Sequence, residues 1–229
     1  MAYFDARLLP QPTSEYVCFL DIMGMQSKMQ HSLSQASNFM FKLHATILEV
    51  LRKSGYESIS VYPIMDGAYI TSRNRADMLK LLTLVYRGLI HSLLGEGDFP
   101  HWFLVRCSVA YGEIIHGRNI PYDASYEFST RVGYKEQLLI GSPMIWACST
   151  EKQAPPMGIY IHSSCASILP NWKWHLNSEI KVDEGELATF KQRTVEYFTW
   201  LDTHSNEQEY PRGKREIHRA SLMQYYGIT

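Results

Sequence analysis

The sequence predicts an α+β fold, in which an antiparallel or mixed sheet carries helices on one face, as in ferredoxin-like folds. Three observations lead to this fold class. Strand-like and helix-like segments follow one another in the order β-α-ββ-α-β(β)-α-β. Two strand-like runs surround Asp66-Gly67, the strongest short-range hairpin signal in the chain. The 229 residues suffice for one large domain, and no Pro/Gly/Ser-rich linker divides them.

The first half of the chain gives the clearest element predictions. Strand-forming residues from Tyr16 to Leu20 predict a first strand that ends at Asp21. Apolar residues at helical spacing predict a helix from about Ser34 to Lys53, which stops at Ser54-Gly55. After the hairpin, a second helix is expected from about Arg75 to Leu94 on the same grounds.

The second half is predicted in less detail. The run WFLVRCSVAYG, from Trp102 to Gly112, predicts a long strand that turns into EIIHG as a hairpin or bulged edge. The segment from Pro121 to Glu136 is expected to be irregular. Ser142-Pro143 predicts a helix start, and GIYIH, from Gly158 to His162, predicts a short strand. Residues Gly185 to Thr203 mix helix-like and strand-like patterns, so no structure is predicted there.

Charge and composition exclude several classes of protein. With 22 basic and 23 acidic side chains, the chain lacks the basic surplus of sequence-independent nucleic-acid binders, so no nucleic-acid partner is expected. The one locally basic stretch, PRGKREIHRA from Pro211 to Ala220, is expected to be a solvated surface. The sequence has no apolar run of 18 residues and no signal-peptide pattern, which predicts a cytoplasmic protein without a membrane partner. The four cysteines lie far apart and are expected to be reduced packing residues.

A carboxylate at the end of an apolar strand needs an explanation, because an unpaired buried charge is costly. In the predicted topology, Asp21 and Asp66 can lie side by side at adjacent strand ends. Two carboxylates placed in this way make an oxygen-ligand site for a hard divalent cation. Each aspartate also has a simpler explanation, Asp21 as a helix N-cap and Asp66 as a residue of a type I′ turn.

Four segments, taken together, resemble a known family. Segments FLDIMGM (from Phe19), YPIMDGAYI (from Tyr62), VRCSVAYGEIIHG (from Val105) and LLIGSPMIWACSTEKQ (from Leu138) follow the motif order of the class III nucleotidyl cyclase catalytic domain. Those motifs run F-x-D-I-x-G-F, K-x-x-G-D, R-x-G-x-x-x-G and D-x-x-G-x-x-V-N-x-A-x-R. The resemblance covers roughly residues 16–152. Residues 166–229 form a C-terminal extension without a predicted role, for which packing on the sheet and dimer contacts are the alternatives.

The resemblance implies a metal-dependent nucleotide cyclase. It makes Asp21 and Asp66 the metal-binding carboxylates and the backbone carbonyl of Ile22 a further ligand, for two divalent cations, Mn²⁺ or Mg²⁺. Backbone N–H groups at Gly24 and Met25 would then meet the β- and γ-phosphates of a nucleoside triphosphate. The implied reaction is attack of the ribose 3′-hydroxyl on the α-phosphorus, with pyrophosphate as the leaving group.

The match continues at Arg106, which takes the place of a phosphate-contacting arginine, but four positions depart from the family motifs. Tyr62 replaces the lysine that reads adenine, and Leu138 replaces the second purine-reading acid. Ile145 and Ser149 stand at the positions of the transition-state asparagine and arginine. Because an aromatic residue narrows the base pocket, the pattern resembles the pyrimidine cyclases of the bacterial Pycsar antiphage system.

That resemblance implies a uridylate cyclase that makes cyclic UMP from UTP and activates an effector through this product. Cyclic CMP from CTP is the alternative, because a tyrosine hydroxyl can donate to or accept from either base. With the family's asparagine and arginine lost, Lys152 is the candidate for the missing transition-state cation. Two simpler alternatives are that Arg106 pairs with an acid such as Glu113 and that Tyr62 is an ordinary cross-strand aromatic.

The resemblance also implies a homodimer with its active sites at the interface. Metal-binding residues of one chain would meet Tyr62 of its mate, which gives two equivalent sites by symmetry. The helix that contains Trp146 is expected to contribute to that interface. A second class of function stays open, namely a degenerate cyclase fold that binds a nucleotide or a partner without turnover.

Overall fold

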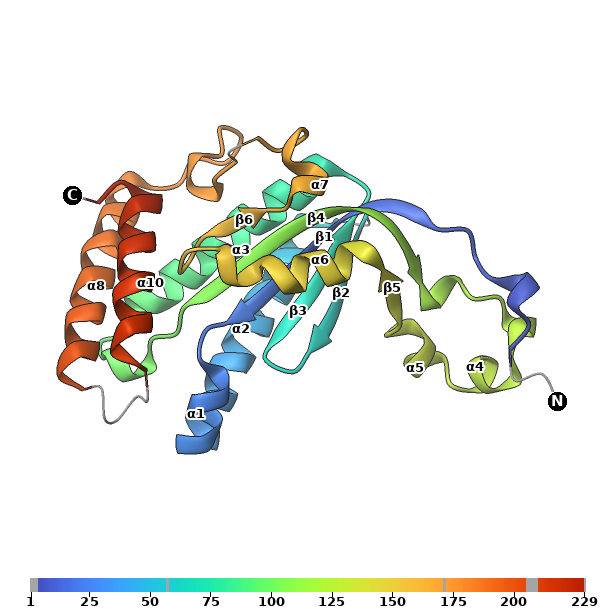
Figure 1. The fold of residues 1–229 in the computed structure, drawn as a ribbon, viewed down its shortest axis with the longest axis horizontal. Helices are drawn as coiled ribbons and strands as arrows, with labels where there is room; N and C mark the ends of the chain where they lie inside the picture. The colour runs from blue at the N-terminus through green and yellow to red at the C-terminus, as the bar shows by residue number, and fades with distance from the viewer. Residues whose placement is uncertain (1–3, 57, 171, 205–209, 229) are drawn as a thin grey trace.

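The computed structural model describes residues 4–56, 58–170, 172–204 and 210–228 (Figure 1). Its centre is a mixed sheet with the strand order β2-β3-β1-β4-β5, in which β6 also pairs with β4. All pairings are antiparallel except β4 with β6, which is parallel. The strands are β1 (Thr13–Ile22), β2 (Ile59–Ile64), β3 (Gly67–Ser72), β4 (Val105–His116), β5 (Leu139–Gly141) and β6 (Ile159–Ile161).

Helices cover both faces of this sheet. Among the described helices, α2 and α3 lie on one face, α6 lies on the other, and α8 and α10 pack side by side at the C-terminal end of the fold (Figure 1). The longer helices are α2 (Leu33–Ser54), α3 (Arg75–Gly95), α6 (Ser142–Thr150), α8 (Glu184–Thr203) and α10 (Arg212–Tyr226). The short helices are α1 (Met25–His31), α4 (Tyr126–Thr130), α5 (Val132–Glu136), α7 (Ser163–Ala166) and the 3₁₀ turns η1 (Ala6–Leu8), η2 (Phe99–His101), η3 (Gly117–Asn119), η4 (Tyr122–Ala124), η5 (Glu151–Gln153) and η6 (Trp174–Leu176).

Strand β1 shows how the sequence builds two cores. Alternate side chains of a strand point to opposite faces, so Cys18 and Leu20 enter the large core under α2 and α3. Val17 and Phe19 enter a smaller cluster on the other face, which includes Ala147 of α6. Asp21 has the parity of this second set, so its side chain belongs to the α6 face.

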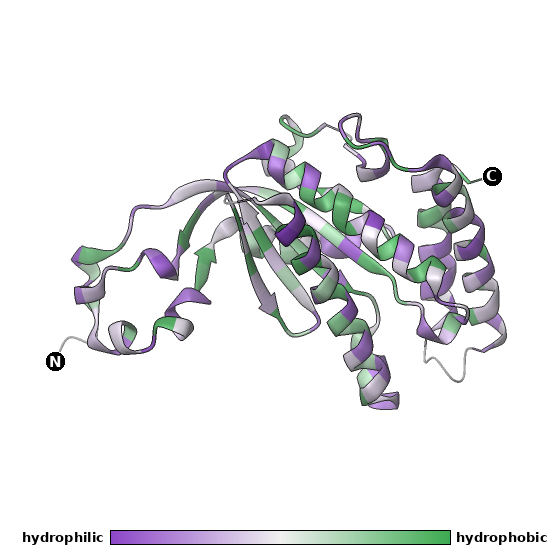
Figure 2. Ribbon diagram, turned by 180° about the vertical axis from the view of Figure 1, so that it is seen from behind, coloured by the Kyte–Doolittle hydropathy of each residue, from purple (hydrophilic) through white to green (hydrophobic). Residues whose placement is uncertain are grey.

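Helix α3 is apolar because it is the central helix of the large core. It is the one described helix that is long and apolar enough to cross a membrane by length and composition, and half of its most apolar stretch is buried inside the fold. Figure 2 shows the hydrophobic residues that run along the helices on this side of the sheet. Leu82, Tyr86 and Leu89 are among the side chains that α3 buries.

Several predicted elements are confirmed. The α+β class is correct, as are the hairpin of β2 and β3 and the two long helices, with Gly55 ending α2 in the left-handed conformation. The predicted helix start at Ser142-Pro143 and the strand within Gly158–His162 are present as α6 and β6. The mixed segment Gly185–Thr203 is helical and forms most of α8.

Three expectations are wrong. Helices do not lie on one face only, because α6 covers the second core. The expected turn near Gly112 is absent, since β4 continues to His116. The glycine serves packing instead, as a Cβ there would lie 3.0 Å from Pro143 Cγ of α6. The segment Pro121–Glu136, expected to be irregular, contains η4, α4 and α5.

Candidate functional site

Asp21 and Asp66 meet at one end of the sheet. Asp21 lies opposite Gly67, the first residue of β3, and the Ile22 N–H donates to the Asp66 carbonyl oxygen at 3.4 Å. A Cβ on Gly67 would lie 2.3 Å from the carbonyl oxygen of Leu20, so only glycine lets the two strands approach this closely. The structure thus brings together the two carboxylates whose proximity the sequence predicts.

The structure excludes a helix N-cap role for Asp21 but keeps a turn role for Asp66. Helix α1 has Gly24 as its N-cap, with φ +74° and no side-chain cap, so Asp21 is not an N-cap. The hairpin turn consists of Met65 and Asp66, and Met65 holds the left-handed conformation with φ +35°. A turn role for Asp66 therefore persists, but the glycine after it belongs to the strand.

The carboxylates repel one another at this end of the sheet. Burial raises the pKa of Asp21 to about 7, and the charges of Asp66 and Glu151 add to the rise, while Arg106 and Lys152 oppose it. Burial also raises the pKa of Glu151, although Arg106 and Lys152 lower it. Three acids that disfavour one another's charge favour a bound cation.

Arg106 lies directly opposite Asp21 in the pairing of β1 with β4, so both side chains share the α6 face. Its Nη2 lies 3.2 Å from Glu151 Oε2, and the two side chains are only 12% and 6% exposed. The Arg106 Nε has no hydrogen-bond partner among the described residues. The expected acid partner exists, but it is Glu151 and not Glu113, which lies opposite Ser14 far along β4.

A cavity of about 410 Å³ opens next to these carboxylates. Its wall includes Met23 and Gly24 after β1, Lys28 of α1, Arg106, and Lys152 of η5. The remaining wall comes from the start of β4 and from the C-terminal helices, through Trp102, Phe103, Leu104, Tyr197, Leu201, Tyr210, Pro211, Lys214 and His218 among others. Among the described residues that line the cavity, none is acidic, so it suits an anionic ligand.

The proposed phosphate-loop residues divide between surface and core. Gly24 is exposed and lines the cavity, in agreement with a place close to a ligand. The Met25 side chain is 1% exposed and belongs to the large core. Helix α1 has only seven residues, so its dipole adds little, and side-chain cations such as Lys28 dominate this wall.

Tyr62 is not brought to the carboxylates. It lies on β2 opposite Tyr69, is buried in the smaller core, and its hydroxyl is hydrogen-bonded to His116 Nδ1. The other ring nitrogen of His116 lies 3.0 Å from Glu15 Oε1. Burial raises the pKa of Glu15, but hydrogen bonds from His116, Thr13 and Arg73 outweigh it and lower this pKa to about 2. His116 therefore joins the Tyr62 hydroxyl and the Glu15 carboxylate in one buried hydrogen-bonded chain.

The positions that depart from the cyclase motifs lie on or before α6. Ile145 is 68% exposed, and Ser149 is exposed and donates to the Trp146 carbonyl at 3.2 Å. Trp146 itself is partly exposed and stacks on His162 at 5.3 Å between ring centroids. Leu138 precedes β5 and is half-buried. The outer side of α6 is therefore apolar and open to solvent within the described chain.

The donor set at the carboxylates fits a hard divalent cation. Within the described part of the chain, no group of three or more His, Cys, Asp or Glu side chains is arranged to hold a metal. A cation there would take Asp21, Asp66 and the Ile22 carbonyl, with its remaining positions open to substrate and water. That ligand count is typical of Mg²⁺ and Mn²⁺ sites that act on phosphates.

Known proteins resemble this chain in fold but not in sequence. No protein-family model matches the sequence, and no curated protein matches it. Solved structures do match by fold. An adenylate/guanylate cyclase/hydrolase from Silicibacter pomeroyi aligns with a TM-score of 0.53 at 12% identity, over 76% of this chain and 87% of that one.

Two further solved structures align in the same way. The adenylyl cyclase CyaB from P. aeruginosa has a TM-score of 0.52 at 15% identity, over 69% of this chain and 81% of that one. The catalytic core of a rhodopsin-guanylyl cyclase with converted specificity, in complex with ATPαS, has a TM-score of 0.50 at 14% identity, over 70% of this chain and 83% of that one. The chain has the fold of a nucleotide cyclase catalytic domain. Sequence identities of 12–15% show a shared fold and do not by themselves show a shared activity.

Two features of this site do not follow from the sequence pattern. Glu151 was overlooked although it directly precedes Lys152, because nothing in the sequence indicates that it packs on Arg106. The basic stretch from Pro211 to Ala220 was expected to be solvated, and this is wrong in part. Arg215 is buried and bonded to the Leu201 carbonyl, whereas Lys214 is exposed as expected and also lines the cavity. The position of Lys28, four residues after Gly24, was the one usable signal.

Proposed function

We propose that this protein is a metal-dependent pyrimidine nucleotide cyclase that converts UTP into 3′,5′-cyclic UMP and pyrophosphate. One observation carries the proposal. In a cyclase fold, Asp21 and Asp66 meet at the sheet end, and Arg106 and Lys152, two cations that act on Asp21, also line a cavity that has no described acidic lining residue. The carboxylates would bind the metal ions of a metal–triphosphate ligand, and the cationic side chains would bind its phosphates.

The roles of the residues follow from their charges. Asp21, Asp66 and the Ile22 carbonyl would hold two divalent cations, Mn²⁺ or Mg²⁺, which when bound lower the pKa of the ribose 3′-hydroxyl and neutralise phosphate charge. Arg106 and Gly24 line the space for the phosphates. The ribose 3′-hydroxyl gives its proton to water and its oxygen forms a bond to the α-phosphorus. The bond between the α-phosphorus and the oxygen that bridges to the β-phosphorus breaks, and pyrophosphate leaves.

Lys152 is proposed to take the part of the family's missing transition-state cation. It lines the cavity, and its charge reaches Asp21, whose pKa it lowers. A cation at this place would stabilise the charge that develops on the transferred phosphorus, an effect that is usually large. Ser149, at the family's arginine position, bonds to its own helix and offers no such charge.

The pyrimidine preference is proposed from Tyr62. A tyrosine hydroxyl can donate to or accept from a base, and the aromatic ring narrows the base pocket compared with the lysine that the family motif carries. Uracil N3–H and the amino group of cytosine could both donate to the hydroxyl, which keeps CTP as the alternative substrate. A lysine at this position could only donate hydrogen bonds to a base, whereas a tyrosine hydroxyl can also accept one.

A homodimer is proposed from the surface that surrounds the site. Met65, in the turn beside Asp66, is 85% exposed, and Ile145 of α6 is 68% exposed. A dimer partner that covers the turn of the hairpin and the outer side of α6 would remove both side chains from water. Contact of Tyr62 of one chain with the carboxylates of its mate would require the dimer to uncover this side chain, which is 5% exposed in the single chain. The product would activate an effector in cytoplasmic antiphage defence.

A second candidate function, nucleotide binding without turnover, is favoured by the apolar Ile145 and the engaged Ser149. The two functions are separated by incubating the protein with Mn²⁺ and equimolar ATP, GTP, CTP and UTP and then separating the products. Cyclic UMP is the expected product. A cyclic purine would overturn the base assignment, and the absence of any pyrophosphate release would favour binding alone.

A further inference from the structure

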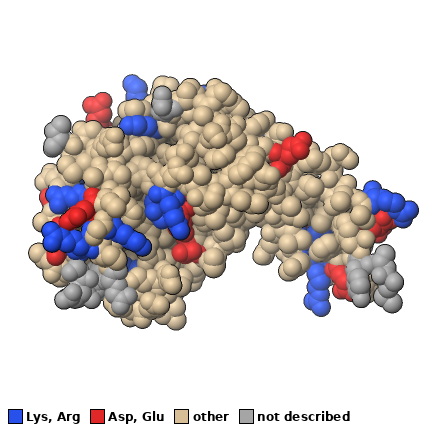
Figure 3. All heavy atoms as spheres, in the orientation of Figure 1, with Lys and Arg blue, Asp and Glu red and all other residues tan. Residues whose placement is uncertain are grey.

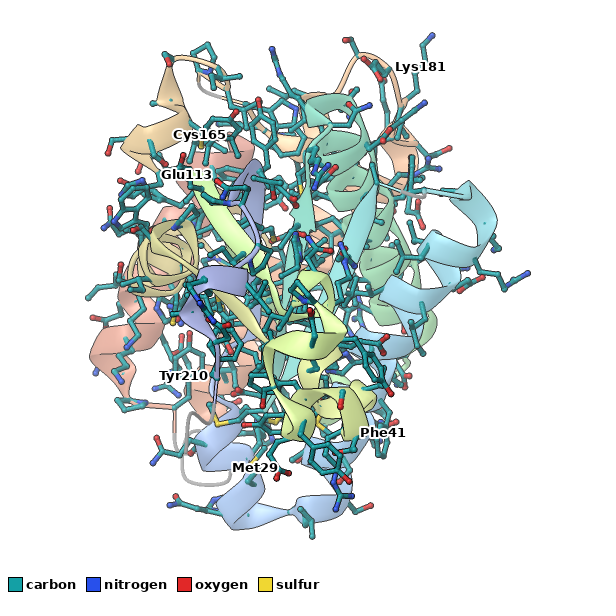
Figure 4. All side chains as sticks on the ribbon, turned by 90° about the vertical axis from the view of Figure 1, so that its right-hand side faces the viewer. Met29, Phe41, Glu113, Cys165, Lys181 and Tyr210 are labelled. Atoms are coloured by element: carbon teal, nitrogen blue, oxygen red, sulfur yellow. The ribbon has the colours of Figure 1, made fainter. Side chains whose placement is uncertain are left out.

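The cavity beside the carboxylates has two walls from distant parts of the sequence. One wall contains Lys28, Arg106 and Lys152, and the other comes from α8 and α10. Figure 4 shows Tyr210, which precedes α10, at the same end of the molecule as Met29 of α1. The C-terminal extension, whose role the sequence leaves open, therefore reaches the ligand-binding end of the fold.

The charge of this cavity is unbalanced. Four basic side chains line it, Lys28, Arg106, Lys152 and Lys214, and no described lining residue is acidic. Of the four, Arg106 alone forms a close ion pair among the described residues, while Lys152 acts at longer range on Asp21 and Glu151. Figure 3 shows Lys and Arg side chains over the C-terminal helices at the left of the view, with Asp and Glu side chains between them, so the imbalance belongs to the cavity lining and not to the whole surface.

Lys28 shows the cost of this arrangement. Burial lowers the pKa of its ammonium to about 8, and the Phe39 ring lies 5.9 Å from its Nζ. Like charges brought together without counter-charges raise the free energy of the folded chain, unless a ligand of opposite charge compensates them. A polyanion is the ligand that this set of groups would bind.

Helix α10, which carries the exposed Lys214, is anchored near both of its ends. Arg215, next to Lys214, is buried, donates to the Leu201 carbonyl and lies 3.4 Å from Asp202. At the other end of the helix, the Tyr226 hydroxyl donates to the Met157 carbonyl at 2.6 Å. A cation on an anchored helix loses little freedom when it meets a ligand.

We propose that α10 completes the phosphate-binding half of the site and that Lys214 binds the terminal phosphate of the nucleoside triphosphate. The inference rests on the proposed function, because it takes the carboxylate end as the place of the α-phosphate. The triphosphate then extends from Arg106 and Lys152, which act on Asp21, toward Lys28 and Lys214 at the far wall. The C-terminal extension is thereby part of the substrate site.

The test uses the full chain and inorganic tripolyphosphate, which carries the charge of the ligand without its base or ribose. Titration calorimetry should show binding to the wild type and about tenfold weaker binding to Lys214→Gln, since one charge-assisted contact is lost. Lys214→Arg should bind like the wild type. The matched control is Lys181→Gln, which removes the same charge from an exposed residue at the opposite end of the molecule (Figure 4).

Two results would overturn the inference. One is wild-type affinity for tripolyphosphate in Lys214→Gln, and the other is no binding to the wild type. Because tripolyphosphate binding does not require turnover, these results are distinct from failure of the cyclase assay. If the wild type binds tripolyphosphate through Lys214 but makes no cyclic nucleotide, the phosphate site stands and the proposed reaction falls.

Discussion

The two halves of the site differ in charge and in origin. The carboxylate half, Asp21 and Asp66, is built by neighbouring strands and a two-residue turn. The cation half is assembled from α1, η5 and α10, which lie far apart in the sequence. The first half therefore follows from strand register, whereas the second depends on how distant helices pack. A metal–triphosphate ligand would need both.

The largest expected effect comes from the carboxylate half. Asp66→Ala should reduce product formation about a thousandfold or more, because a lost metal carboxylate removes both hydroxyl activation and charge neutralisation. Pyrophosphate release with Mn²⁺ and UTP measures it. The control is Asp98→Ala, an exposed aspartate ahead of η2. Full activity in Asp66→Ala would remove the metal assignment.

The link between the halves is the Arg106–Glu151 pair. Glu151→Gln leaves a buried guanidinium without its counter-charge and should lower the free energy of unfolding by about 3 kcal/mol. Urea denaturation measures this change. Replacing both Arg106 and Glu151 by methionine should recover most of the lost free energy of unfolding, because no unpaired charge then stays buried. An unchanged midpoint in Glu151→Gln would show that the pair does not hold the two halves together.

Gly67 tests whether strand approach positions the carboxylates. Gly67→Ala places a Cβ against the Leu20 carbonyl and should destabilise the fold by about 2 kcal/mol while displacing Asp66. Gly95→Ala, at the end of α3 where a Cβ meets nothing within 4 Å, should be neutral or slightly stabilising. Equal thermal midpoints for the two variants would contradict the close packing of β1 on β3.

The pH dependence of metal binding tests the carboxylate half of the site separately from the cation half. Because burial and neighbouring acids raise the pKa of Asp21 to about 7, the metal-free fold holds this proton and loses stability as pH rises from about 4 toward 7. A bound cation displaces the proton. Apparent Mn²⁺ affinity should thus fall about tenfold per pH unit below 7. Calorimetry at pH 5.5 and 6.5 measures it, and equal affinities would argue against Asp21 as a ligand.

The sequence predicted what local patterns determine. Alternation along β1 and the hairpin signal are enough to place Asp21 near Asp66, and helical spacing gives α2 and α3. The partner of Arg106 and the position of Lys214 could not be predicted, because each depends on contacts between segments tens of residues apart. The turn expected at Gly112 failed for the same reason, since this glycine accommodates α6 and does not bend the strand.

The most direct test of the two-half site is a crystal structure with Mn²⁺ and a non-reactive UTP analogue, with the metal located by its anomalous signal. The account predicts manganese between Asp21 and Asp66, with the phosphates running along Arg106 and Lys152 toward Lys28 and Lys214. Manganese bound elsewhere, or a nucleotide that leaves this cavity empty, would contradict it.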